Sequence, residues 1–201
     1  MKVIKTPLAG VVVIEPKVFR DDRGYFLETY NQEKLSDQEF TPIFVQDNHS
    51  LSQRGTVRGL HAQRLQPQGK LVRAVEGTIF DVAIDLRQDS PTYRHWWGTK
   101  LSEENFLQLY IPPGFAHGFS VLSERAQVQY KCTALYNASD EISLRWDEAK
   151  LINAETGEQT GVDWQLGLTE PVLSQRDAEA PLLEEIEPKL LNVPAYCTSG
   201  A

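Results

Sequence analysis

Apolar residues in this chain form short runs, some of them continuous and some alternating with polar residues. Such alternation places successive side chains on opposite faces of a β-strand, whereas an amphipathic helix repeats about every 3.6 residues. Ten runs have the length and pattern of strands: Gly10–Ile14, Tyr25–Tyr30, Ile43–Asn48, Leu71–Val75, Thr78–Leu86, Trp96–Leu101, Phe106–Ile111, Gly118–Leu122, Ala126–Leu135 and Ile142–Trp146. Many short strands at this spacing, with turn residues between them, predict an all-β sandwich or barrel.

Helical patterns are few and short in this sequence. Two segments favour a helix, Glu33–Glu39 and Pro181–Ile186. The chain has 201 residues and no internal repeat, which predicts a single domain over residues 1–201.

The alternation also predicts which side chains share a face of a strand. Val128, Tyr130 and Cys132 point one way, and they form the more apolar set in their run. We therefore expect Tyr130 to point into the barrel. By the same rule, His61 and Gln63 lie on one face.

Composition and charge narrow the classes of function. The net charge is −8 and the sequence has no basic run, so we expect no nucleic-acid partner. The apolar run Val11–Ile14 is too short for a signal peptide, and the longest uncharged span contains Pro112, Pro113 and Gly114. We therefore expect no membrane segment and a cytoplasmic protein. The two cysteines, Cys132 and Cys197, are expected to be free thiols.

Two motifs bring histidines together with glycines. The first is Arg58-Gly59-Leu60-His61-Ala62-Gln63, followed by Lys70 and Gly77, and the second is Pro112-Pro113-Gly114-Phe115-Ala116-His117. Together they resemble the two halves of the cupin pattern, in which two histidines, an acid and a later histidine bind one divalent ion. Here Gln63 replaces the second histidine, and no Asp or Glu lies between it and Glu76. This set is poor for catalytic zinc or iron, so we expect a barrel without a metal or other cofactor.

A longer series of motifs resembles one family, the dTDP-4-dehydrorhamnose 3,5-epimerases of the cupin superfamily. The resemblance covers about residues 1–182. It is carried by Asp22–Glu28, Gln46–Asn48, Arg58–His61, Gly69–Arg73, Phe80–Arg87 with Ser90-Pro91, Pro113–Phe119, Tyr130–Cys132 and Leu173–Asp177, in this order. The tail 189–201 lies outside the resemblance and receives no functional interpretation.

The resemblance implies a cupin-type jelly-roll β-barrel with a few short helices and a metal-independent reaction. The reaction would invert C3 and C5 of dTDP-4-dehydro-6-deoxy-D-glucose, through an enolate, to give dTDP-4-dehydro-L-rhamnose for a surface glycan. By resemblance, His61 is the base, Asp177 orients it, Lys70 holds the enolate oxygen and Tyr130 is the acid on the opposite ring face. A histidine suits a base near neutral pH, and a phenol arrives protonated. Asp81 is expected to orient Lys70.

Further residues match the family's contacts to the dTDP-linked 4-keto-6-deoxyhexose. Arginines suit a diphosphate because they give bidentate contacts, and a flat side chain suits thymine. Tyr136 matches the base-stacking position. The other matching residues are Arg23, Phe26, Glu28, Gln46, Asp47, Asn48, Arg58, His117, Glu141 and Arg176. The resemblance also implies a homodimer that exchanges N-terminal strands, so that Arg23, Phe26 and Glu28 would serve the partner's site.

Three other functions remain open at this point. A related epimerase that acts at a single carbon, or that makes another deoxysugar, would keep the same base, acid and lysine. A metal-dependent cupin oxygenase or isomerase is disfavoured by Gln63 and by the missing acid. A non-catalytic binder of sugar nucleotides is disfavoured by the set of His61, Lys70, Tyr130 and Asp177.

Overall fold

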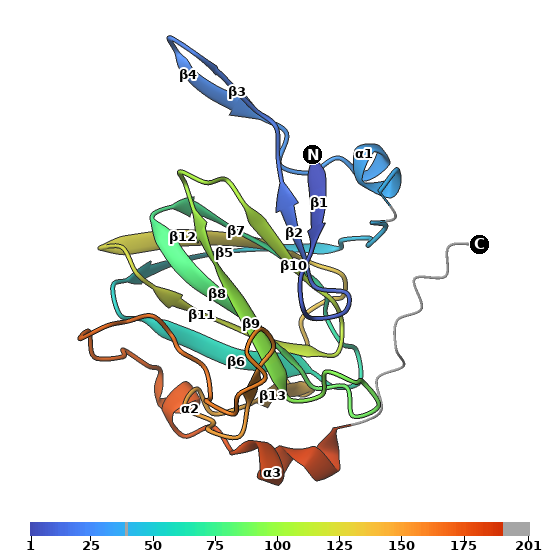
Figure 1. Ribbon diagram of the computed structural model, residues 1–201, viewed down its shortest axis with the longest axis vertical. Helices are drawn as coiled ribbons and strands as arrows, with labels where there is room; N and C mark the ends of the chain where they lie inside the picture. Colours follow the sequence, from blue (N-terminus) through green and yellow to red (C-terminus); the bar gives the residue numbers. More distant parts are fainter. Residues whose placement is uncertain (39, 191–201) are drawn as a thin grey trace.

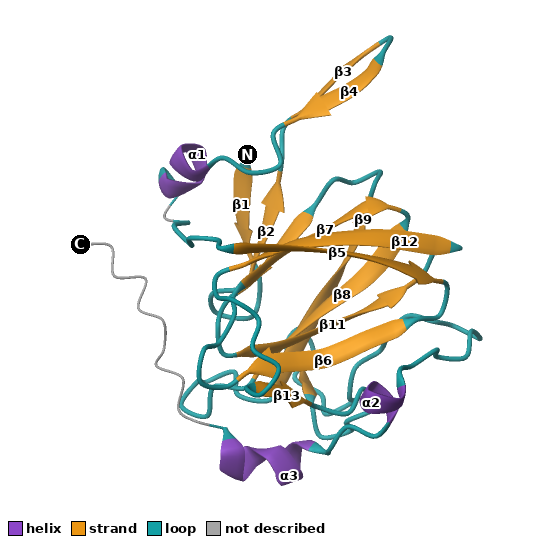
Figure 2. Cartoon of the chain, turned by 180° about the vertical axis from the view of Figure 1, so that it is seen from behind, coloured by secondary structure: helices purple, strands orange, loops and turns teal. Residues whose placement is uncertain are grey.

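The computed structural model describes residues 1–38 and 40–190, which form two facing six-stranded sheets (Figures 1 and 2). Sheet 1 has the order β1-β2-β10-β7-β12-β5, and sheet 2 has the order β13-β6-β11-β8-β9-β14. The strands of sheet 1 are β1 (Lys2–Lys5), β2 (Val12–Glu15), β5 (Gln46–Gln53), β7 (Lys70–Glu76), β10 (Gln108–Ile111) and β12 (Arg125–Cys132). The strands of sheet 2 are β6 (Val57–Gln63), β8 (Thr78–Asp85), β9 (His95–Ser102), β11 (Phe115–Val121), β13 (Glu141–Ser143) and β14 (Ile152–Asn153).

The space between the sheets holds the main core. Val72 and Val128 from sheet 1 pack there with Ala83 and Phe119 from sheet 2. The inward residues come from alternate positions of their strands, as the period of two requires. This packing confirms the predicted all-β, jelly-roll type of fold, and Tyr130 packs against this core as expected.

A second core covers the outer face of sheet 2. Phe80, Val82 and Ile84 of β8 face outward and are buried under the chain that follows β13, including Trp164 and Leu183. Strand β8 is therefore buried on both faces, and its inner face includes the buried carboxylates of Asp81 and Asp85. The covering segment contains α2 (Gln175–Ala178), α3 (Leu183–Ile186) and a 3₁₀ turn, η1 (Glu187–Lys189).

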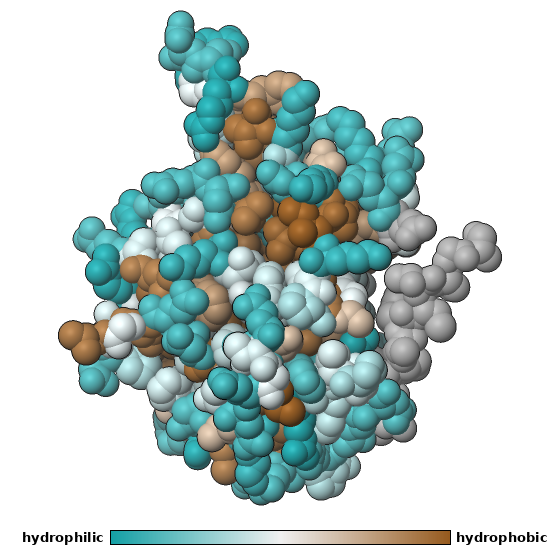
Figure 3. Space-filling model, viewed as in Figure 1, coloured by the Kyte–Doolittle hydropathy of each residue, from teal (hydrophilic) through white to brown (hydrophobic). Residues whose placement is uncertain are grey.

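A two-stranded hairpin projects from the body of the barrel. It consists of β3 (Val18–Asp21) and β4 (Gly24–Leu27), and it is followed by the short helix α1 (Gln32–Ser36) (Figure 1). The hairpin exposes Phe19, Tyr25 and Phe26, and the exposed fraction of Phe26 is 71%. Figure 3 shows further apolar side chains gathered below the projecting hairpin.

The ten predicted runs all overlap strands, and both predicted helical segments overlap helices. The pattern did not predict β1, β3, β6, β14 or α2. The pattern did not predict β6 because Arg58, Gly59 and His61 interrupt its apolar positions. It did not predict α2 because a helix of four residues is too short to show a helical period. Cys132 is buried and free, whereas Cys197 and most of the tail 189–201 lie outside the described residues. No helix in the described part of the chain is long and apolar enough to cross a membrane.

Candidate active site

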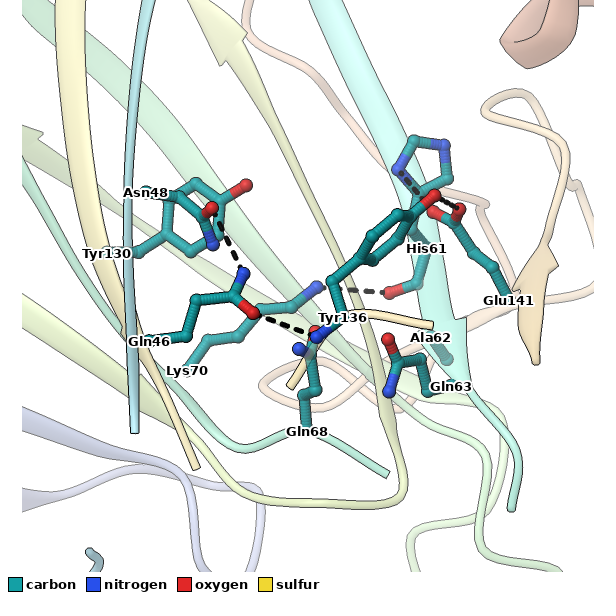
Figure 4. Close-up of a pocket in the computed structure, with 10 residues that line it drawn as sticks. All are labelled: Gln46, Asn48, His61, Ala62, Gln63, Gln68, Lys70, Tyr130, Tyr136 and Glu141. Atoms are coloured by element: carbon teal, nitrogen blue, oxygen red, sulfur yellow. Dashed lines mark hydrogen bonds and ion pairs between the residues drawn. The ribbon is translucent and has the colours of Figure 1, made fainter. Parts of the chain in front are cut away.

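A polar cavity lies between the two sheets. It consists of two adjoining pockets of about 260 and 390 Å³, which share His61, Lys70 and Tyr130 in their walls. His61 comes from β6 of sheet 2, whereas Lys70 and Tyr130 come from β7 and β12 of sheet 1. A molecule in the cavity would therefore meet His61 on one side and Tyr130 on the other (Figure 4).

The structure brings eleven of the fifteen predicted site residues to this cavity. They are Gln46, Asn48, Arg58, His61, Lys70, His117, Tyr130, Tyr136, Glu141, Arg176 and Asp177.

His61 and Asp177 form a close pair, although 116 positions separate them in the sequence. The His61 Nε2 atom lies 2.7 Å from Asp177 Oδ1. An Nε2–H that donates to this carboxylate leaves the lone pair of the neutral ring on Nδ1. Nδ1 lies 3.6 Å from Glu141 Oε1, so a positive charge formed on the ring would be flanked by two carboxylates.

Hydrogen bonds fix the position of Asp177 beside His61. It lies in α2, whose N-cap residue Ser174 accepts a hydrogen bond from the Asp177 backbone N–H at 3.1 Å. Burial raises the pKa of Asp177, but hydrogen bonds from His61, Ser174 and the Gly59 backbone outweigh this effect and lower the pKa overall. Asp177 is therefore ionised at neutral pH, as an orienting carboxylate must be.

The strand that carries His61 passes very close to β11. Gly59 has a φ of +106°, and a Cβ atom at this position would lie 2.6 Å from the carbonyl oxygen of His117. Only glycine fits such an approach, because any side chain would collide with the backbone. This contact places His61 directly opposite His117 in the ladder between β6 and β11.

Lys70 extends into the cavity from the opposite sheet. Its Nζ lies 3.5 Å from the carbonyl oxygen of His61, at the limit of a hydrogen bond, and it forms no ion pair within the described residues. Burial lowers the pKa of Lys70, although the nearby Cys132, Glu141 and Asp81 act against this shift. A poorly solvated ammonium group of this kind is suited to stabilise an anion that forms in the cavity.

Tyr130 faces His61 across the cavity. Burial raises the pKa of its phenol, so the hydroxyl carries its proton at neutral pH and can donate it. Asn48 lies opposite Tyr130 on the neighbouring strand β5, where the Gln46 Nε2 donates to Asn48 Oδ1 at 3.1 Å. These side chains form the wall of the cavity on the side of sheet 1.

His117 and Asp81 form a buried pair on β11 and β8. The His117 Nε2 atom lies 2.8 Å from Asp81 Oδ1, so Asp81 bonds to His117 and not to Lys70, which corrects the expectation from the sequence. Burial lowers the pKa of His117 despite this carboxylate. The ring is therefore neutral near pH 7, and its Nδ1 can accept a hydrogen bond from a hydroxyl group.

Cations and an aromatic ring line the outer parts of the cavity. Arg58 is exposed, and its Nε donates to Ser52 Oγ at 2.8 Å. Arg176 pairs with Glu141 at 2.8 Å, and the Tyr136 hydroxyl lies 2.7 Å from the same carboxylate. Figure 4 shows the Tyr136 ring lying across the cavity between Gln46 and Glu141.

Four predicted site residues lie outside this cavity. Asp47 points to the opposite face of β5, where Lys131 Nζ bonds to it at 3.0 Å, because neighbouring residues of a strand face opposite ways. Arg23, Phe26 and Glu28 lie on or just after the projecting hairpin. There Arg23 pairs with Asp21, and Glu28 pairs with Lys34.

The cavity also contains residues that the sequence did not single out as site residues. Gln63 and Gln68 line the pocket near Tyr136, and Ser50 and Ser174 line the pocket near Arg58. The inward position of Ser50 follows from the alternation in β5, so the strand pattern could have found it. The position of Ser174 depends on the fold of α2, for which the sequence gives no periodic signal.

The residues at the cupin metal position do not fit a metal ion. The Nε2 atoms of His61 and His117 face carboxylates, and the Gln63 amide is hydrogen-bonded to backbone groups. The Lys70 ammonium group lies beside them and would repel a cation. Among residues 1–38 and 40–190, no group of three or more His, Cys, Asp or Glu side chains is arranged to hold a metal.

Comparison with known proteins agrees with the motifs and the geometry. The sequence model of the dTDP-4-dehydrorhamnose 3,5-epimerases matches residues 5–185. The chain belongs to this family. The family's enzyme from Salmonella typhimurium is 49% identical over 189 residues, which cover 92% of this chain and 97% of that enzyme.

Two further relatives are informative about the reaction within the family. A dTDP-6-deoxy-D-glucose-3,5-epimerase from Legionella pneumophila, solved in complex with dTDP-4-keto-L-rhamnose, is 43% identical with a TM-score of 0.86. The match covers 94% of this chain and 96% of that structure. A dTDP-4-dehydrorhamnose 3-epimerase from Streptomyces niveus is 35% identical, over 96% of this chain and 89% of that protein.

Proposed function

We propose that this chain is a metal-independent epimerase that inverts C3 and C5 of dTDP-4-dehydro-6-deoxy-D-glucose to give dTDP-4-dehydro-L-rhamnose. The observation that carries the proposal is the placement of the His61–Asp177 pair on one wall of the cavity and of Tyr130 on the other. Inversion requires that a proton leave one face of the sugar ring and that another arrive on the opposite face. The names of the family and of the relative with bound dTDP-4-keto-L-rhamnose support the same reaction.

The chemistry begins at the carbons on either side of the 4-keto group. A proton on such a carbon is acidic because its loss leaves an enolate. In our proposal, His61 Nδ1 takes this proton, and Asp177 holds the ring and stabilises the imidazolium that forms. Lys70 stabilises the negative charge on the enolate oxygen, and Tyr130 returns a proton from the other face.

The nucleotide part of the substrate needs cations and a flat surface. Tyr136 offers an exposed ring at the mouth of the cavity, and Arg58 and Arg176 offer guanidinium groups near it. We propose that the ring stacks on thymine and that the arginines bind the diphosphate. The neutral His117 would contact a sugar hydroxyl instead of supplying positive charge to the diphosphate.

We also propose that the protein is a homodimer in which each hairpin β3–β4 reaches the partner's cavity. The hairpin extends away from its own barrel and exposes Phe19, Tyr25 and Phe26, which would be covered in such a dimer. Arg23 and Glu28 would then contribute to the partner's site. We propose a cytoplasmic location, which the free thiol of Cys132 favours, because reducing compartments keep cysteines unpaired.

Proton NMR of the 4-keto sugar nucleotide in D₂O tests the proposed reaction. The expected result is deuterium at both C3 and C5, together with signals of the L-rhamno product. Exchange and inversion at C3 alone would instead indicate a single-carbon epimerase, as the similarity to the Streptomyces niveus protein allows. Absence of exchange in a protein that binds dTDP would indicate a binding protein.

A further inference from the structure

Gln63 lies at the end of β6, two residues after His61, and its exposed fraction is 5%. Within the described residues, its side-chain amide bonds only to backbone groups of two loops. The Nε2 atom donates to the carbonyl oxygen of Gln66 at 2.7 Å and to that of Leu135 at 3.2 Å. The Oε1 atom accepts from the N–H of Asn137 at 2.9 Å. Both N–H groups of the amide are used, so only one orientation satisfies all three bonds.

Two of these bonds flank Tyr136. Leu135 supplies the carbonyl before it and Asn137 supplies the N–H after it, so the Gln63 amide hydrogen-bonds to the backbone on both sides of this residue. The Tyr136 N–H itself donates to Gln46 Oε1 at 2.8 Å. Figure 4 shows Gln46 and Gln63 on either side of the Tyr136 backbone.

Apolar packing cannot hold this segment in place. The exposed fractions of Leu135 and Tyr136 are 62% and 52%. A loop with so little buried apolar surface depends on its hydrogen bonds for order. Besides Gln46 and Gln63, Gln68 supports the segment by donating from Nε2 to the carbonyl oxygen of Ala134 at 2.7 Å.

We propose that Gln63 is a positioning residue that fixes Tyr136 over the mouth of the cavity and thereby sets the affinity for the nucleotide. This inference rests on the proposed function, in which Tyr136 stacks on thymine. A ring that is already held in its binding position loses less conformational freedom when the ligand arrives. The position that supplies a metal ligand in metal-binding cupins would then serve as a loop anchor in this chain.

The variant Gln63→Glu tests this role with almost no change in shape. A carboxylate cannot donate to the carbonyl oxygens of Gln66 and Leu135, and it would face both of them with negative charge. We expect the dTDP affinity, measured by calorimetry, to fall about tenfold. We also expect KM to rise by a larger factor than kcat falls, because the reacting groups stay in place.

The double variant separates positioning from a general loss of stability. If Gln63 acts through Tyr136, then Gln63→Glu in a Tyr136→Ala background should change dTDP affinity by less than about twofold. An equal, additive loss in both backgrounds would overturn the proposal, and so would an unchanged affinity in the folded single variant. The matched control is Gln88→Glu, which removes an amide-to-carbonyl bond to Glu187 outside the cavity and should leave dTDP affinity unchanged.

A second variant and a second measurement keep the test decisive. If Gln63→Glu does not fold, Gln63→Met removes the same hydrogen bonds without adding charge, and the same pattern of affinities is expected. Hydrogen exchange of the amides of Tyr136 and Asn137 should become faster in either variant. Unchanged exchange would contradict the proposal that Gln63 positions Tyr136. Exchange needs no ligand, so a wild-type protein that failed to bind dTDP would refute the proposed function without deciding the role of Gln63.

Discussion

His61 Nε2 lies 2.7 Å from Asp177 Oδ1, and this contact joins strand β6 to the four-residue helix α2. We expect Asp177→Asn to lower kcat about 10³-fold, because a neutral amide neither fixes the same tautomer nor stabilises an imidazolium. Steady-state kinetics would measure this loss. Glu179→Gln, an exposed acid that directly follows α2, is the control and should keep normal activity. A normal kcat in folded Asp177→Asn would remove Asp177 from the mechanism.

The two proton-transfer roles can be separated in D₂O. His61→Ala should abolish deuterium uptake at both carbons, because no enolate forms without the base. Tyr130→Phe keeps the base and Lys70, so exchange from the side of His61 can continue while inverted product falls sharply. NMR measures exchange and inversion together. A folded His61→Ala protein that exchanges at the normal rate would exclude His61 as the base, and normal inversion by Tyr130→Phe would exclude Tyr130 as the acid.

Lys70 should lower stability while it supports activity. Burial lowers its pKa in the folded protein, so the charged form is less favourable there than in the unfolded chain. Lys70→Met is expected to abolish activity and to raise the free energy of unfolding at pH 7 by ~1 kcal/mol. The gain should shrink as the pH rises through the lowered pKa, where the wild-type amine becomes neutral. Denaturant unfolding at neutral and alkaline pH measures this difference, and a less stable Lys70→Met protein would contradict it.

Nucleotide binding should depend on Arg58. A charged hydrogen bond to phosphate typically contributes about 1.5–3 kcal/mol, so Arg58→Ala should weaken dTDP binding at least tenfold. Calorimetry with dTDP measures the change. The control is Arg54→Ala, because Arg54 is exposed but does not line the cavity. Equal affinities of the Arg58→Ala and wild-type proteins would place the diphosphate elsewhere.

Removal of metal ions should leave the activity unchanged. The histidines at the cupin metal position bond to carboxylates, and Gln63 bonds to the backbone, so these groups are not available as a ligand set. Full turnover is expected after dialysis against EDTA. A loss of turnover that a divalent ion restores would show that the reaction depends on a metal.

The sequence by itself determined the class of fold and most of the residues of the site. Alternation in a run such as Ala126–Leu135 reflects which side chains are buried, and burial on one face is a local property of a strand. The motifs around His61, Lys70, Tyr130 and Asp177 predicted the reacting groups through family resemblance. The local pattern failed at β6, where a glycine needed for close contact with β11 breaks the apolar alternation.

Only the tertiary structure decided which of these groups meet. Asp81 bonds to His117 and not to Lys70, because this contact depends on how β8 and β11 pair within the sheet. The hairpin carries Arg23 away from the cavity of its own chain. The hydrogen bonds from Gln63 to the backbone around Tyr136 join segments more than 70 residues apart. Contacts at such separation arise from packing, which the pattern of single residues along a chain does not encode.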